Sequence, residues 1–231
     1  MPGVKRELKE AILYAAPFVT WIALQMLLPA TAASYAARAG ATAVVGLACL
    51  KALNALRGIQ EFKGPKDMRA RWAIAGLVGG LAVCALWIAP EYSIWYRTWL
   101  ELPLGEPPPA PGPSPYEPSV CGWPLTLAKL VGSAFVIAPV EEVFFRSFLY
   151  RRLQAADFRA VPLSRFDLSS FLWMVFLFTL EHDRPVVAAL AGAAYGLLAI
   201  RFGLGSAIVA HVVTNLALGL HVICRGEWWF W

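Results

Sequence analysis

The feature that most constrains this chain is a cluster of charged residues inside a long apolar stretch. Glu141 and Glu142 are followed one helical turn later by Arg146, while residues 130–140 before them and 147–150 after them are largely apolar. An ionised side chain at the centre of a bilayer costs about 2.5–3.5 kcal/mol on insertion scales, so such a residue points to a functional site. The cluster therefore predicts a polar site within a membrane-embedded helix.

The composition of the whole chain agrees with a membrane protein. Of its 231 residues, 59% are hydrophobic and only 15% are charged, whereas soluble domains carry about 25% charged residues. Crossing a bilayer takes ~20 helical residues, and about seven segments approach that length. They lie at residues 11–30, 36–56, 72–90, 123–150, 168–182, 186–200 and 204–223. We predict an all-α polytopic transmembrane helical bundle. Its fifth and sixth segments are short, so they either tilt or stop before the far interface.

The distribution of basic residues predicts the orientation in the membrane. With the N-terminus inside, most Arg and Lys residues fall on the cytoplasmic side, which satisfies the positive-inside rule. The formal net charge of +5 then reflects topology, and no soluble basic domain is expected to bind nucleic acid. The first apolar stretch is nearer ~20 residues than the 7–15 of a cleavable signal, so we expect the first helix to be retained.

A proline-rich stretch divides the chain. Residues 101–118 contain eight prolines in eighteen positions, a composition that favours extended polyproline structure over helix. We predict an outer-face loop there. It separates N-terminal transmembrane helices in residues 1–122 from a core in residues 123–231 that carries the chemistry, the two parts forming one bundle.

Two pairs of glycines predict close helix packing. Gly76 with Gly80, and Gly192 with Gly196, place small residues four positions apart. Such pairs let membrane helices approach closely. They indicate packing and say nothing about function.

Helical geometry predicts different roles for the two glutamates of the charged cluster. Glu142 and Arg146 are spaced i,i+4 with the acid first, which is the favourable orientation for an ion pair. Glu141 points ~100° away around the helix, so we expect it to face a cavity while Glu142 neutralises Arg146. Pro139 lacks an N–H and is expected to kink the helix. The alternative is an ion pair that snorkels to the interface, which leaves one acid without a partner.

Three further polar residues lie on other apolar segments. His182 ends the run from Leu172 to Leu180, and such a histidine alone is more often an interfacial residue or a helix end than a catalytic residue. His211 and Asn215 lie one turn apart on one helical face, so they can address a single oxygen atom or form an interhelical hydrogen-bond pair. His221 reads as interfacial.

Taken together, these residues indicate a hydrolytic site. A buried carboxylate near imidazole can act as a general base on water, and an imidazole with a carboxamide can donate to a developing oxyanion. No Ser or Cys nucleophile is well placed. The combination favours hydrolysis of a peptide bond by activated water.

The motifs resemble the CAAX prenyl endoprotease and bacteriocin-processing family of intramembrane proteases. The family signatures Glu-Glu-xxx-Arg, Phe-xxx-His and His-xxx-Asn occur in order here, as residues 141–146, 178–182 and 211–215. The C-terminal pattern from Thr214 to Gly219, followed by residues 226–231, further resembles the exosortase-associated branch. That branch implies a bacterial inner-membrane protein.

The resemblance also implies roles. Glu141 corresponds to the catalytic base, His182 to its partner, His211 and Asn215 to the oxyanion site, and Glu142 and Arg146 to supports. We expect no cofactor; zinc held by Glu141, His182 and His211 is a minority alternative, because His-Glu-xx-His spacing is missing. The expected substrate is a protein or peptide in the bilayer, with or without a lipid, cut near its C-terminus or in its membrane region.

Two other functions stay open at this point. One is a non-catalytic membrane scaffold or immunity-type protein, and the other is a proton-coupled transporter using Glu141 and His182. The enzyme hypothesis requires His182 to lie close to Glu141. A straight helix from residue 168 would instead place His182 ~22 Å across the membrane, too near the outer face. We therefore predict that this helix enters from within residues 160–168, with His182 drawn towards Glu141.

Overall fold

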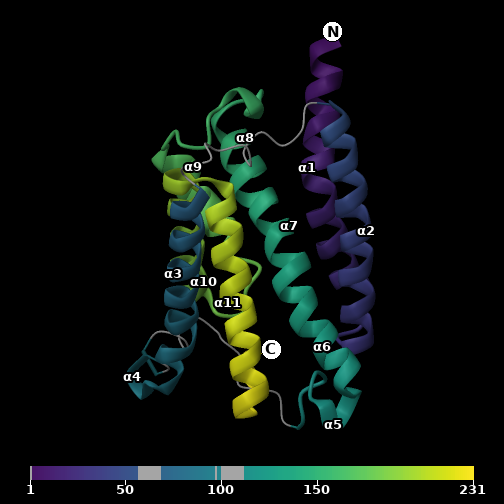
Figure 1. Ribbon diagram of the computed structural model, residues 1–231, viewed down its shortest axis with the longest axis vertical. Helices are drawn as coiled ribbons and strands as arrows, with labels where there is room; N and C mark the ends of the chain where they lie inside the picture. The colour runs from purple at the N-terminus through teal and green to yellow at the C-terminus, as the bar shows by residue number, and fades with distance from the viewer. Residues whose placement is uncertain (1, 57–68, 97, 100–111) are drawn as a thin grey trace.

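The protein is a bundle of helices, as the sequence predicts. The computed structural model describes residues 2–56, 69–96, 98–99 and 112–231, and these ranges contain helices and no strand (Figure 1). Most of the predicted proline-rich loop, residues 101–111, lies outside the described residues. The all-α polytopic class is confirmed, and the protein is an integral membrane protein.

Six helices within the described residues are long and apolar enough to cross a membrane. They are α1 (Pro2–Leu27), α2 (Ala32–Leu56), α3 (Arg69–Ile88), a continuous helix running from Trp123 to Gln154, α10 (Pro185–Phe202) and α11 (Leu204–Arg225). Short helices cap the bundle: η3 (Ala89–Tyr92), α4 (Ile94–Tyr96), α5 (Pro118–Cys121), η8 (Phe158–Ala160) and η9 (Trp228–Phe230).

The remaining apolar segment forms a helix that stops inside the bundle. Helix α9 spans Leu168–Thr179, and its first turn is capped by Asp167, whose side chain accepts a hydrogen bond from the Ser170 backbone N–H at 2.8 Å. Twelve residues of helix reach only ~18 Å, well short of the ~30 Å hydrocarbon core. This segment therefore agrees with the expectation that it stops short, whereas the sixth segment forms α10, which is long and apolar enough to cross the membrane.

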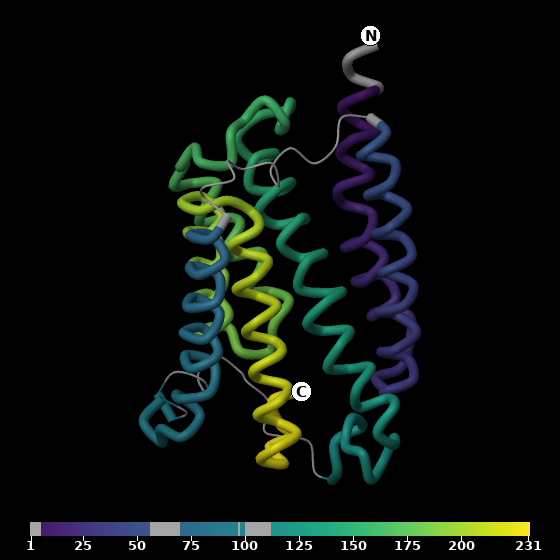
Figure 2. The backbone as a smooth tube through the Cα atoms, in the orientation of Figure 1, coloured from purple at the N-terminus to yellow at the C-terminus, as the bar shows by residue number. Residues whose placement is uncertain are grey.

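The helices form two groups on either side of the long central helix (Figure 2). Helices α1 and α2 pack together on one side, and α3, α9, α10 and α11 form the other group. The central helix contacts both groups, through α2 and α1 on one side and α11 on the other. The N-terminus lies at one end of the long axis, and the C-terminus lies towards the opposite end.

The central helix changes its winding around the charged cluster. Its parts are α6 (Trp123–Gly132), the π-helical η6 (Ser133–Ile137), α7 (Ala138–Glu142), the π-helical η7 (Val143–Leu149) and α8 (Tyr150–Gln154). Pro139 has no N–H to donate to the preceding turn, and the π-helical segment η6 lies directly upstream of α7. Short π segments inside helices often mark functional sites.

Both predicted glycine pairs are confirmed as close-packing positions. A Cβ atom at Gly76 would lie 2.8 Å, and one at Gly80 2.5 Å, from backbone oxygens of α11. A Cβ atom at Gly192 or Gly196 would lie within 2.9 Å of aromatic carbons of α9. Contacts this short are not tolerated, so these glycines fix how closely α3 and α9 approach their neighbours.

Candidate active site

Glu142 and Arg146 form the predicted ion pair. Arg146 Nη1 lies 3.0 Å from Glu142 Oε1, and both side chains are almost completely buried. Arg146 Nη2 also donates to the backbone carbonyl of Gly192 at 3.0 Å, and its guanidinium lies 4.5 Å from the ring centroid of Phe178. The pair thus ties the central helix to α10 and α9 and does not snorkel to an interface.

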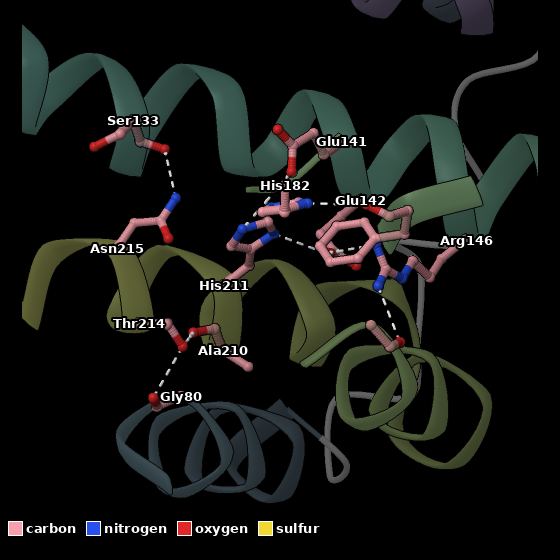
Figure 3. Close-up of polar contacts among 12 residues, drawn as sticks. Gly80, Ser133, Glu141, Glu142, Arg146, His182, Ala210, His211, Thr214 and Asn215 are labelled. Carbon is pink, nitrogen blue, oxygen red and sulfur yellow. Dashed lines mark hydrogen bonds and ion pairs between the residues drawn. The ribbon is translucent and has the colours of Figure 1, made fainter. Parts of the chain in front are cut away.

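His211 reaches this ion pair from α11. Its Nδ1 lies 2.9 Å from Glu142 Oε1, and its Nε2 lies 3.8 Å from Glu141 Oε2 (Figure 3). The ring stacks on Tyr195 with centroids 4.6 Å apart. The sequence did not indicate the contact with Glu142, because these residues are 69 positions apart. Glu142 therefore joins His211 to Arg146 as well as neutralising the arginine.

His182 lies in the turn that follows α9. Its Nδ1 is 2.9 Å from the carbonyl oxygen of Phe178, and since a carbonyl only accepts, Nδ1 must donate and Nε2 is the acceptor in the neutral ring. Helix α9 begins at Leu168, the last residue of the predicted entry interval, and ends before His182. In the described structure no hydrogen bond or ion pair joins His182 to Glu141.

Asn215 makes an interhelical hydrogen bond to the backbone of the central helix. Its Nδ2 donates to the carbonyl of Ser133 at 3.0 Å, which leaves a second N–H on the same nitrogen (Figure 3). Ser133 is the first residue of η6, so this bond fastens α11 to the π-helical turn. Thr214 Oγ1 donates to the carbonyl of Gly80 at 2.9 Å and links α11 to α3.

One cavity of about 550 Å³ brings the four predicted catalytic residues together. Glu141, His182, His211 and Asn215 all line it, from the central helix, the turn after α9, and α11. Glu142 and Arg146 are not part of its lining and sit behind His211. Its lining also includes Gln25 near the end of α1, Lys129 in α6 and Trp231. Lining residues that the sequence reasoning missed include Trp87, Lys129 and Trp231.

A metal ion would need several ligand side chains close together. Among the described residues, no three or more His, Cys, Asp and Glu side chains are arranged to hold one. His211 Nδ1 is taken by Glu142, and His182 Nδ1 by a carbonyl. These contacts use only Nδ1 of each ring and leave Nε2 available. The expectation that no metal cofactor is bound stays a prediction, and no chemical step is derived through a metal.

The fold and the site together define a class of protein: a polytopic helical membrane protein with a buried cluster of glutamate, histidine and arginine beside an internal cavity. Residues 123–217, which contain all three motifs, match the model of the Rce1-like family, the type II CAAX prenyl endopeptidases. This match agrees with the resemblance seen in the motifs. No curated protein and no solved structure matches the chain.

Proposed function

We propose that the protein is an intramembrane endopeptidase that hydrolyses a peptide bond with an activated water molecule. The observation that carries this proposal is the shared cavity, which gathers two imidazoles, a carboxylate and a carboxamide from three parts of the chain. The family of residues 123–217 is a protease family, which supports the same reaction class.

Glu141 acts as the general base. Its Oε2 lies 3.8 Å from His211 Nε2, a separation at which one water can hydrogen-bond to both groups. Glu141 accepts a proton from this water while the water oxygen attacks the peptide carbonyl. The proton then passes to the departing amide nitrogen, the C–N bond breaks, and Glu141 is regenerated.

His211 and Asn215 stabilise the charge that develops on the carbonyl oxygen. Glu142 accepts from His211 Nδ1, and Arg146 holds Glu142, so the ring is fixed with Nε2 towards the cavity. In its protonated form this nitrogen donates to the oxyanion, and the unused N–H of Asn215 supplies a second donor. Glu142 and Arg146 act through His211 and are positioning residues.

His182 lines the same cavity from the turn after α9 and assists Glu141. Because Nδ1 donates to the Phe178 carbonyl, Nε2 is free to accept a proton from water or from a substrate group. The Phe178 ring lies 4.5 Å and the Trp87 ring 5.7 Å from the imidazole, which limits its rotation. We assign His182 as the partner of Glu141 in activating water.

The direction of the cavity bears on where the substrate enters. The cavity leads away from the N-terminal end of the bundle, and the basic residues predict a cytoplasmic N-terminus. The substrate would then enter from the outer side of what we propose is a bacterial inner membrane. We propose a membrane-associated protein or peptide as substrate, with or without a lipid, and expect no nucleic-acid partner.

The test uses purified full-length protein in liposomes and a peptide library analysed by mass spectrometry. We expect wild-type protein to produce defined cleavage products, Glu141→Gln to form them at least about 100-fold more slowly, and a metal chelator to leave the wild-type rate unchanged. A scaffold would show no cleavage, and a proton-coupled transporter would show flux that collapses with the proton gradient. Cleavage by Glu141→Gln at the wild-type rate would overturn the proposal, and chelator-sensitive cleavage would restore the zinc alternative.

A further inference from the structure

Two basic side chains lie against one aromatic ring near the far end of the catalytic cavity. Lys129 Nζ on α6 lies 4.2 Å from the ring centroid of Tyr35 and 4.7 Å from that of Tyr116. The Arg38 guanidinium on α2 lies 5.7 Å from Tyr35 and 4.8 Å from Trp21. Lys129, Tyr35 and Trp21 all line the cavity that contains Glu141.

Neither cation has an acidic partner in the described part of the chain. Arg38 is only 6% exposed, and its Nε has no hydrogen-bond partner there. Lys129 is half-buried with its ammonium group over aromatic faces. Glu181 and Asp183 line the same cavity, yet no ion pair joins either of them to Lys129. Aromatic faces attract cations but do not neutralise them.

Two such cations beside one ring repel each other, and burial strengthens the repulsion. Buried charges in proteins are paired or bind an ion, and ionisable groups within membrane bundles mark binding sites and pathways. A simple snorkelling role does not account for Arg38, because its side chain is buried. The arrangement calls for an anion in the cavity beside Lys129.

The central helix aligns Lys129 with the catalytic carboxylate. Lys129, Ser133, Ile137 and Glu141 all line the cavity, at successive intervals of four residues. In an α-helix each such step overshoots a full turn by ~40°, so three steps would rotate Glu141 well away from Lys129. The π-helical segment η6 lies between them and holds more residues per turn, which keeps the four side chains on one face.

The same alignment sets a distance. Twelve residues of helix separate Lys129 from Glu141, which is on the order of 18 Å at ~1.5 Å per residue. An extended peptide advances about 3.3–3.6 Å per residue. A peptide lying along this face would therefore have about five residues between the bond at Glu141 and the group at Lys129.

We propose that Lys129, supported by the charge of Arg38, binds a carboxylate of the substrate about five residues from the scissile bond. This inference rests on the proposed endopeptidase function and adds the chemistry by which a substrate is selected. The carboxylate is either the C-terminus of the substrate or an acidic side chain. Lys129 contacts it directly, while Arg38, which does not line the cavity, adds positive charge 5.7 Å from the Tyr35 ring centroid.

The experiment starts from a cleaved peptide of the library and varies one group at a time. One series ends in a free carboxylate placed three to seven residues from the cut, and a matched series ends in an amide. A third series is amidated and carries Asp or Asn at those positions. We expect kcat/KM to fall about tenfold or more when the carboxylate about five residues away becomes uncharged. The terminal and the side-chain series show which kind of carboxylate is bound.

Three variants test the assigned residues in the full chain. Lys129→Met should remove the preference for the carboxylate while amidated peptides are still cut, and Lys129→Arg should retain the preference. Arg38→Met should weaken it. Lys51→Met on the exposed face of α2 is the matched control and should keep the wild-type preference.

The outcomes separate the two proposals. If wild-type protein cuts acid and amide peptides equally, the carboxylate site is wrong and the protease remains. If no peptide is cut, the proposed function fails. Peptide binding to the Glu141→Gln variant is measured in parallel. If this variant binds acid peptides more strongly than amide peptides, and adding Lys129→Met removes the difference, the carboxylate site is supported without any cleavage. Equal binding of both peptides contradicts it, and this measurement does not depend on the Lys129 variants being folded.

Discussion

Helix α11 carries two histidines, each paired with a glutamate, and their surroundings differ. His211 contacts Glu142 at 2.9 Å in the interior of the bundle, and Glu142 is in turn held by Arg146. His221 contacts Glu227 at 2.7 Å near the end of the helix, where both side chains are partly exposed. The ion-pair distance is nearly the same in both cases. The difference lies in what surrounds each pair.

A histidine–carboxylate contact alone therefore does not make a reactive site. Around His211 a second carboxylate, Glu141, lies 3.8 Å from the free ring nitrogen and both line a cavity. Around His221 the glutamate instead accepts a hydrogen bond from the Tyr92 hydroxyl at 2.6 Å, and neither His221 nor Glu227 lines that cavity. The first pair leaves an atom free for chemistry. The second links α11 to the end of α3.

The two clusters are Glu141, Glu142 and His211 beside the cavity, and Tyr92, His221 and Glu227 near the end of α11. The largest expected difference between them is the loss of catalytic rate when one carboxylate charge is removed from each. Glu141→Gln should lower kcat for peptide cleavage by about 10²–10⁴-fold, the contribution typical of a general base. Glu227→Gln is the matched control and should leave kcat unchanged. Both rates are measured on the same library peptide in liposomes. Equal losses in the two variants would erase the distinction between the clusters.

The next effect concerns stability. Arg146→Met removes one partner of a buried ion pair and leaves Glu142 with an uncompensated charge, which costs about 3–5 kcal/mol. The change is measured as the free energy of unfolding in detergent, with the exposed Arg225→Met as the control near the other cluster. The double variant with Glu142→Gln should lose less stability than the two single losses added together. Strict additivity would mean that the two side chains do not act as a pair.

A smaller effect on catalysis is expected at the oxyanion site. Asn215→Ala should lower kcat by about 10²-fold with little change in KM, because the lost donor acts on the transition state. His221→Ala, two turns further along α11, should change neither constant. A rise in KM with unchanged kcat would assign Asn215 to substrate binding or to packing on Ser133.

The parts of this site that depend on local helix geometry could be predicted from the sequence. The Glu142–Arg146 pair and the shared face of His211 and Asn215 follow from spacings of four residues. The approach of His211 to Glu142 could not be predicted in this way. It joins residues 69 positions apart and depends on how the central helix packs against α11.

Two other features lie beyond what hydropathy and spacing convey. Apolar composition predicts that α9 is buried in the membrane, but its end at Thr179 depends on the turn that carries His182. The π-helical segment η6 likewise could not be predicted, because its composition does not differ from that of the α-helix around it. Lys129 was not identified as a site residue, because its aromatic surroundings come from α2 and from Tyr116, far apart in the sequence.

The smallest expected effect is a pH dependence of stability that comes from Glu227 in the cluster with Tyr92 and His221. The hydrogen bond from Tyr92, followed by the contact with His221, holds the pKa of Glu227 below its ordinary value. A carboxyl with a lowered folded pKa adds stability that is fully present above the unfolded pKa of about 4.3 and is lost as pH falls through the folded pKa. The melting temperature of the wild type should therefore exceed that of Glu227→Gln at pH 6, and the two should converge as the pH falls below about 4. Since Glu227 lies outside the cavity, cleavage rates of the two proteins should agree at pH 6, and a melting difference that persists unchanged at low pH would show that the charge of Glu227 does not contribute.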